Sequence, residues 1–230
     1  KILRTKIYLF LGAFFVSLLF LSVSTYFAFK NSWKGVQFDL PEPFNLLGPK
    51  LYKSIIVLLV ILTSVVLGLT TSYNWELFLR FFNSSTFAIN DPIFNRDISF
   101  YIFDFPIFTF IQKGLLIISI LSMIYSLAII FINSVFAGLE FSENTIMKKQ
   151  MIINFSIILL LFSIGILFSR WNILFSETGV VYGAGYTDAN IKMNTLFFMS
   201  FLGFILSVLV LFSLKYSLTR FVYIPTVAWV

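Results

Sequence analysis

The stretch GLLIISILSMIYSLAIIFINSVFAGL, residues 114–139, decides the fold of this chain. It contains no Asp, Glu, Lys or Arg, and it is longer than the roughly 20 apolar residues that cross a bilayer core as an α-helix. Lipid offers no hydrogen-bond partner to the backbone, so such a uniform run must bond to itself. The stretch therefore predicts a transmembrane helix, which could begin as early as Ile107.

Four further runs share this character, and they cover residues 7–29, 54–72, 151–169 and 193–214. The first is too long for the apolar region of about 7–15 residues in a cleaved signal peptide, so we expect a permanent span. Barrel strands would be shorter and would alternate. Another span begins near residue 221, and we expect the chain to be a fragment with a missing C-terminal remainder. The predicted fold is an all-α, polytopic transmembrane helix bundle with interfacial or re-entrant loop helices.

Composition supports a location in the cell membrane. Hydrophobic residues make up 59% of the chain and charged residues only 11%, with a mean hydropathy of +0.97. Cysteine and histidine are absent, which excludes disulfides, thiol nucleophiles, histidine bases and zinc sites built on these residues. The basic residues lie at the ends of the runs rather than in a nucleic-acid-binding cluster. We expect the lipid bilayer as partner, no nucleic acid and no cofactor.

Orientation follows less directly from the sequence. The basic residues divide equally between the two sides of a five-span topology and leave the orientation open. The residues that precede the first run favour a cytoplasmic N-terminus, because the first helix usually dominates. Alternation of the spans places Arg96 and Thr187 on one side of the membrane and Glu143 on the other.

The loop after the second run combines an apolar character with several charges. Its segment WELFLRFF, residues 75–82, predicts a short helix in the membrane interface, with Phe78 and Phe82 away from the headgroups. Asn90, Asp91 and Pro92 predict a turn or a helix start. Asp97 is expected to cap a second short helix, residues 98–105, which Pro106 kinks or ends. The aspartates of the loop, which include Asp104, and Arg96 suggest either a polar or cation-binding site or helix capping with water-exposed ion pairs.

The loop between the fourth and fifth runs reads GVVYGAGYTDAN, residues 179–190. Its glycines permit positive φ and close backbone approach, but the lysine and Ser/Thr of a phosphate-binding P-loop are missing. A structured re-entrant turn is the simpler interpretation, with Thr187 or Asp188 as the cap of the fifth helix. We expect this loop to fold against the loop at residues 91–104, which we call the aspartate loop. The candidate polar surface patch then comprises Asp91, Arg96, Asp97, Asp104, Gly183, Gly185, Tyr186, Thr187, Asp188 and Asn190.

Pairs of small residues occur at helical spacing inside three runs. Such pairs let helices approach closely. They predict packing rather than a particular partner, and they are Ser64 with Gly68, Gly165 with Ser169, and Gly203 with Ser207.

Two loop segments, DPIFNRDISFYIFDFPIF and RWNILFSETGVVYGAGYTDAN, resemble the signature loops of a large uncharacterised bacterial family of multi-pass membrane proteins. The resemblance covers about residues 75–194. It implies a multi-pass region followed by a large water-soluble domain, and it brings no activity or catalytic residue. The chain departs from the family at Asn190, where some members have histidine.

Three classes of function remain open from the sequence. The first is a membrane anchor or scaffold for an extracytoplasmic domain or an envelope partner, with a homo-oligomer as another form of partner. The second is a transporter or channel subunit, against which the charge-free runs argue. The third is an envelope enzyme that uses the carboxylates of the loops.

Overall fold

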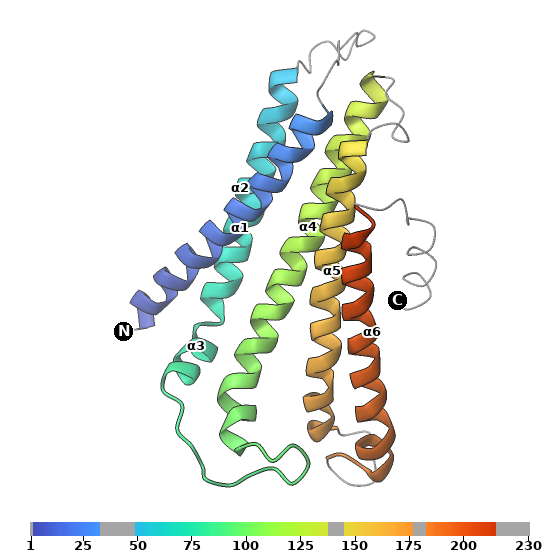
Figure 1. Cartoon of the computed structure of the whole chain (residues 1–230). Helices are drawn as coiled ribbons and strands as arrows, with labels where there is room; N and C mark the ends of the chain where they lie inside the picture. Colours follow the sequence, from blue (N-terminus) through green and yellow to red (C-terminus); the bar gives the residue numbers. More distant parts are fainter. Residues whose placement is uncertain (1, 33–48, 138–144, 177–182, 215–230) are drawn as a thin grey trace. The chain divides into compact units, whose positions relative to one another are not determined.

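The computed structural model describes residues 2–32, 49–137, 145–176 and 183–214. Long helices dominate this part of the chain (Figure 1). They are α1 (Ile2–Ser32), α2 (Pro49–Tyr73), α4 (Phe105–Ala137), α5 (Thr145–Asn172) and α6 (Met193–Phe212), together with the short helix α3 (Trp75–Phe82). No β-strand occurs in the described ranges, apart from one isolated bridge between Asn90 and Asp97.

The helical fold class is confirmed. Five helical segments are long and apolar enough to cross a membrane, and each overlaps one of the five predicted runs: Ile2–Lys30, Leu51–Tyr73, Phe100–Asn133, Lys148–Phe175 and Asp188–Phe212. The further span expected near residue 221 lies outside the described residues.

The described helices fall into two compact units. The first combines Lys1–Trp75 with Ile118–Asn154, and the second combines Glu76–Ile117 with Phe155–Val230. Helices α4 and α5 therefore contribute one part of their length to each unit.

In the first unit, α1 and α2 pack along each other (Figure 1). Gly68 of α2 makes this possible, because a Cβ there would lie 3.0 Å from the ring of Phe10 and 3.1 Å from its carbonyl oxygen. Ser64, one turn earlier, is fully buried. The predicted packing role of this small-residue pair is confirmed. The apolar core of the unit consists of Leu21, Ala28, Ile56, Val60, Ile118 and Ile129.

A buried polar cluster joins three helices of the first unit. The Ser122 hydroxyl donates to Ser24 Oγ at 2.7 Å, and the hydroxyls of Ser24 and Ser126 lie 2.9 Å apart. Gln150 Nε2 of α5 donates to the Ser24 carbonyl at 2.9 Å and to Ser126 Oγ at 3.2 Å. The side chains of this cluster thus satisfy one another, as an apolar surrounding requires.

Polar side chains also form hydrogen bonds between the helices of the second unit. Gln112 Nε2 of α4 donates to the Leu161 carbonyl of α5 at 2.7 Å, beside Gly165, where a Cβ would lie only 2.8 Å from that nitrogen. Between α5 and α6, the hydroxyls of Ser156 and Ser207 each donate to the other's carbonyl, at 2.8 and 2.9 Å. The Ser163 hydroxyl donates to the Ser200 carbonyl in the same way.

Helix α3 forms at the predicted residues. Arg80 and Glu76 pair at 2.6 Å on an exposed face. The Phe78 ring contacts Phe110 with 5.9 Å between centroids, and Phe81 contacts Phe108 at 6.2 Å. Phe82, in contrast, is 74% exposed. Phe78 and Phe81 therefore pack onto α4, while the Phe82 side chain stays exposed.

Candidate functional site

The candidate site begins with a single helical turn at residues 91–95 of the second unit. The Asp91 carboxylate accepts the Phe94 amide at 2.6 Å, and the Asp91 carbonyl accepts the Asn95 amide at 2.9 Å. Asp91 is thus the N-cap and Pro92 the first residue of the turn, as the sequence predicts. Asn95 ends it with a positive φ of 52°, which asparagine tolerates better than most residues.

The Asp97 carboxylate binds backbone amides at both ends of the loop. Its Oδ1 accepts the Ser99 amide at 2.8 Å and caps the helix that begins at Ile98, as predicted. The same carboxylate accepts the amides of Phe87 at 3.3 Å and Ala88 at 2.9 Å. Hydrogen bonds from the amide and hydroxyl of Ser99, then from the Phe87 and Ala88 amides, hold the pKa of Asp97 below its usual range. Backbone bonds flank the Asn90–Asp97 bridge and tie the loop into a hairpin.

Pro106 does not end the helix that Asp97 begins, and that alternative of the prediction was wrong. The chain passes from Ile98 through a π-helical turn, Phe100–Asp104, into α4 without interruption. Proline has no amide to donate, and the π-helical turn just before it already departs from the regular hydrogen bonding of an α-helix. The wider turn accommodates the extra residue before Phe105, whose amide bonds to the Phe100 carbonyl. Asp104 is half-buried in this turn.

Arg96 lies on aromatic rings rather than beside a carboxylate. Its guanidinium carbon is 4.5 Å from the centroid of Phe100 and 5.2 Å from that of Trp171 on α5. Trp171 in turn packs against Phe100, Phe105 and Phe168. The expected ion pairs between Arg96 and the aspartates are absent among the described residues. The aspartates instead bind backbone amides, which leaves the arginine to the rings.

The second loop of the site has a related construction. Gly183, with a φ of +103°, donates its amide to the Ser176 carbonyl at 3.0 Å. The next helical segment begins at Tyr186 and enters α6 through a π-helical turn, Asp188–Lys192. Residues 179–182 of this loop lie outside the described residues.

Gly185, rather than Thr187 or Asp188, is the N-cap of this segment. The Gly185 carbonyl accepts the Ala189 amide at 2.9 Å, so Asp188 is the third helical residue. Its carboxylate reaches back to the Gly185 amide at 3.2 Å, which is the acidic half of a capping box. Asp188 also pairs with Lys192 at 3.6 Å. Tyr186 is 85% exposed, and its carbonyl accepts the Asn190 side chain at 3.0 Å.

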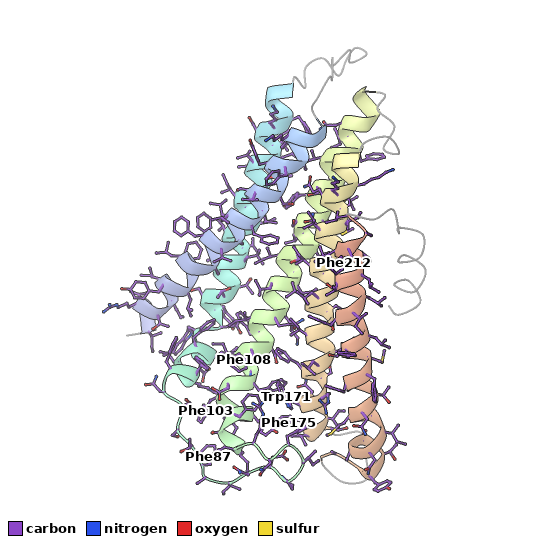
Figure 2. The ribbon with its side chains drawn as sticks, in the orientation of Figure 1. Phe87, Phe103, Phe108, Trp171, Phe175 and Phe212 are labelled. Atoms are coloured by element: carbon purple, nitrogen blue, oxygen red, sulfur yellow. The ribbon has the colours of Figure 1, made fainter. Side chains whose placement is uncertain are left out.

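Both loops contact the C-terminal end of α5. Tyr101 packs its ring on Phe175 at 6.2 Å, and Arg96 lies over Trp171. Gly183 bonds to Ser176, and Arg170 lies 4.9 Å from the ring of Phe197 on α6. Figure 2 shows Trp171 in the last turn of α5 and Phe175 in the 3-10 turn, Ile173–Phe175, that follows it. Each loop thus has contacts at this helix end, and direct packing of the two loops against each other stays a prediction.

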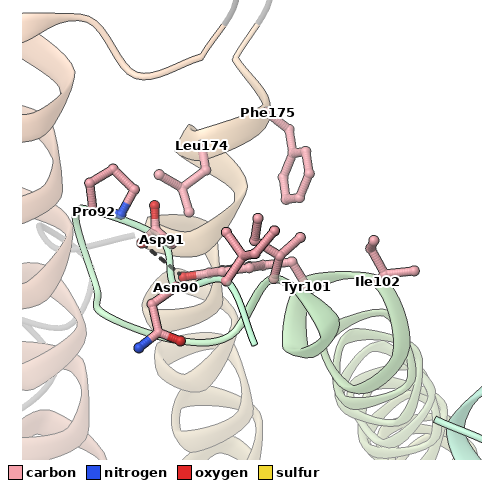
Figure 3. Close-up of a pocket in the computed structure, with 9 residues that line it drawn as sticks. Asn90, Asp91, Pro92, Tyr101, Ile102, Leu174 and Phe175 are labelled. Carbon is pink, nitrogen blue, oxygen red and sulfur yellow. Dashed lines mark hydrogen bonds between the residues drawn. The ribbon is translucent and has the colours of Figure 1, made fainter. Parts of the chain in front are cut away.

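An open cavity of about 380 Å³ lies in the aspartate loop (Figure 3). Its polar lining comes from Asn90, Asp91 and Tyr101, whose hydroxyl donates to Asp91 Oδ2 at 3.2 Å. Its other walls are apolar and are formed by Ile89, Pro92, Ile98, Ile102, Leu174 and Phe175. Such a lining suits an apolar group that carries one hydrogen-bonding function.

The cation-binding interpretation finds no support within the described ranges. No group of three or more Asp, Glu, His or Cys side chains there is arranged to hold a metal ion. Asp91, Asp97 and Asp188 each bind backbone amides of their own loop. Capping explains them without a ligand.

Sequence reasoning missed the aromatic environment of the arginines. Phe94 and Trp171 lie far apart in the sequence, and neither periodicity nor spacing relates them. The available signal was the coincidence of arginines and aromatic residues in two loops on the same predicted side of the membrane.

The fold and the site define a class of protein: an α-helical chain with five helices able to cross a membrane, and with two capped loops that each contact one helix end. The chain belongs to the uncharacterised protein family UPF0182, whose profile matches residues 1–230. The family resemblance expected from the two loop segments is thereby confirmed.

Relatives in several bacteria carry the same family name. A UPF0182 protein of Trichodesmium erythraeum is 31% identical over 222 residues, which cover 92% of this chain and 23% of the relative. One of Clostridium novyi is 35% identical over 182 residues, 72% of this chain and 20% of the relative. The chain therefore spans about a fifth of the length of these relatives. No solved structure matches the chain.

Proposed function

We propose that this chain is a multi-pass module of the bacterial cell membrane that anchors and positions an extracytoplasmic domain or an envelope partner. One observation carries the proposal: the polar side chains inside the spans are used for helix-to-helix contacts. Ser24, Ser122 and Gln150 join α1, α4 and α5 in the first unit. Gln112 and Ser156 do the same in the second.

The character of these contacts favours a structural role over transport. Membrane transporters place carboxylates, basic residues or broken helices near the middle of the bilayer. The five runs contain no Asp, Glu, Lys or Arg. The two π-helical turns lie at the beginnings of the spans that α4 and α6 form, not in their middles. A membrane interior built in this way suits a rigid support.

The docking surface in this proposal is the polar patch of the two loops together with the cavity beside it. The proposal therefore places these loops and the N-terminus outside the cytoplasm, which the equal division of basic residues allows but which is opposite to the orientation favoured by the residues before the first run. The patch comprises Asp91, Arg96, Asp97, Asp104, Gly183, Gly185, Tyr186, Thr187, Asp188 and Asn190. The hydrogen bonds of Asp97 and Asp188 fix the backbone of each loop. The cavity accepts an apolar side chain of the anchored domain, and the exposed Tyr186 offers a further contact. The length of the relatives supports a large domain as the occupant.

Site-directed cross-linking in cells tests the proposal. A photo-cross-linker attached to a cysteine at Ile102, in the cavity wall, should join the full-length protein to a polypeptide segment outside this module. A cross-linker at Ile117, on the same helix and 48% exposed, is the matched control and should label lipid. The absence of native cysteines in this chain makes the labelling specific here.

A flux assay supplies the opposing result. Vesicles that contain the full-length protein should hold trapped ions and small solutes as tightly as empty vesicles. Solute movement that depends on the protein, together with lipid-only products from position 102, would identify a transporter or channel and contradict the anchoring role.

A further inference from the structure

Two arginines of the second unit have no counter-ion among the residues that the structure describes. The Arg170 guanidinium lies 5.6 Å from the ring centroid of Phe94 and 4.9 Å from that of Phe197, and Arg96 lies over Phe100 and Trp171. Neither arginine is within salt-bridge distance of a described carboxylate. An aromatic ring contacts the flat face of a guanidinium group. The N–H donors along the edge of that group therefore stay available.

The nearest carboxylates have other partners. Asp91 Oδ2 accepts the Phe94 amide and the Tyr101 hydroxyl. Asp97 binds three backbone amides, and Asp188 pairs with Lys192. These three carboxylates are therefore already used by the backbone and by another cation. Within the described residues the two arginines have no anionic partner.

Arg170 has the clearest unsatisfied hydrogen-bond donor of the two arginines. Its Nε is buried and has no hydrogen-bond acceptor among the described residues. A buried donor without an acceptor is destabilising. The two aromatic rings hold the guanidinium in place, and an acceptor bound at its terminal N–H groups would supply the anionic partner that this arginine lacks among the described residues.

The surroundings distinguish a lipid from a dissolved ion. Arg170 lies in the last turn of α5, and the first turns of α6 next to it expose large apolar side chains: Phe197 by 46%, Phe198 by 64% and Phe201 by 56%. Tryptophan and arginine at the end of an apolar helix are typical of the headgroup region of a bilayer. Acyl chains can cover the exposed phenylalanines while a phosphate reaches the arginines.

We propose that Arg96 and Arg170 form a binding site for the phosphodiester headgroup of an anionic membrane lipid, at the point where the aspartate loop meets the ends of α5 and α6. Planar guanidinium groups bind phosphate oxygens through paired N–H donors. The aromatic rings orient both groups before the lipid arrives. This site shares Arg96 with the proposed docking patch, but lipid binding does not require the anchoring role.

The test uses full-length protein in nanodiscs, with Trp171 as the only reporter and every other tryptophan, including Trp33, Trp75 and Trp229 of this chain, replaced by phenylalanine. Brominated phosphatidylglycerol, diluted into phosphatidylcholine, should quench Trp171 at a concentration roughly tenfold lower than brominated phosphatidylcholine. The double variant Arg96→Gln/Arg170→Gln should lose this preference. The double lysine variant should keep part of it, because charge remains but the planar donor pair is lost.

Two controls make the outcome decisive. Lys113→Gln removes an exposed positive charge from the same unit and should leave the preference unchanged. Inorganic phosphate, added in millimolar amounts, should not displace the brominated lipid. Equal quenching by the two lipids in the unmodified arginine background, an equal loss with Lys113→Gln, or displacement by inorganic phosphate would each overturn the proposal.

Discussion

Arg96 and Arg170 each lie on an aromatic ring that neighbours the other arginine in sequence. Arg96 covers Trp171, which follows Arg170, and Arg170 covers Phe94, two residues before Arg96. This reciprocal contact fastens the aspartate loop to α5 by two separate cation–ring pairs. It also explains why the loop keeps its position without an ion pair to α5 among the described residues.

Removal of one of these cations should loosen the loop. Arg96→Leu loses both ring contacts, and we expect a decrease of about 1 kcal/mol in the free energy of unfolding. Arg80→Leu is the matched control, because its ion pair with Glu76 is exposed and such pairs contribute little. Thermal unfolding in detergent measures both. Equal losses in the two variants would contradict a stabilising role of the rings under Arg96.

Asp97 should make the loop sensitive to acid. Its pKa is lowered in the folded protein, so its hydrogen bonds stabilise the loop fully above the ordinary aspartate value of 3.8. That stabilisation is lost as the pH falls through the lowered folded pKa. Protection of the Ala88 and Ser99 amides from hydrogen exchange should follow this course, and Asp97→Asn should remove the pH dependence.

Alanine substitutions of Asp97 and Asp188 should lower stability by different amounts. Asp97→Ala leaves three backbone amides without their acceptor and should lower the free energy of unfolding. Asp188→Ala removes one amide bond and an exposed ion pair, so a smaller loss is expected. The several kcal/mol typical of a buried charge pair do not apply, because neither carboxylate is buried. Glu143→Ala, outside the described residues, serves as the reference for a loop substitution in the same unfolding measurement.

The sequence predicts the spans well and the loops unevenly, for a physical reason. A charge-free run such as residues 114–139 has one solution in lipid, so composition alone determines it. Local caps such as Asp91 and Asp97 were also predictable, since they involve neighbours in the chain. The N-cap before α6 was predicted at Thr187 or Asp188, because their side chains carry an oxygen acceptor. The first helical hydrogen bond instead goes to the Gly185 carbonyl. The partners of Arg96 required distant contacts that no local pattern encodes.

Membrane topology provides a direct test of the five-span arrangement. Single cysteines at Ser85 and Thr187 should react with an impermeant reagent from the same side, because an even number of predicted spans separates them. A cysteine at position 143 should react only from the opposite side. Modification of positions 85 and 143 from one side alone would contradict this arrangement.

Helix α3 should divide its phenylalanines between two roles. Phe78 contacts Phe110 of α4, so Phe78→Ala should lower the stability of the second unit. Phe82 is 74% exposed, so Phe82→Ser should leave unfolding unchanged. If α3 lies in the interface, the serine variant should instead reduce quenching of Trp75 by lipids brominated near the headgroup. Loss of stability with Phe82→Ser, and none with Phe78→Ala, would refute this division.

Gly165 offers the sharpest test of close helix packing in the second unit. A Cβ at this position would lie 2.8 Å from Gln112 Nε2, which donates to the Leu161 carbonyl. Gly165→Ala must therefore displace Gln112 and leave its buried amide without an acceptor, at a cost of roughly 1–3 kcal/mol. Gly114→Ala is the matched control, because nothing lies within 4 Å of its added Cβ, and alanine favours a helix over glycine. Thermal unfolding should show a clear loss for Gly165→Ala and none for Gly114→Ala. The combination Gly165→Ala/Gln112→Ala removes both the clash and the stranded amide, and it should be more stable than the sum of its single variants. Simple additivity would mean that Gly165 and Gln112 do not constrain each other.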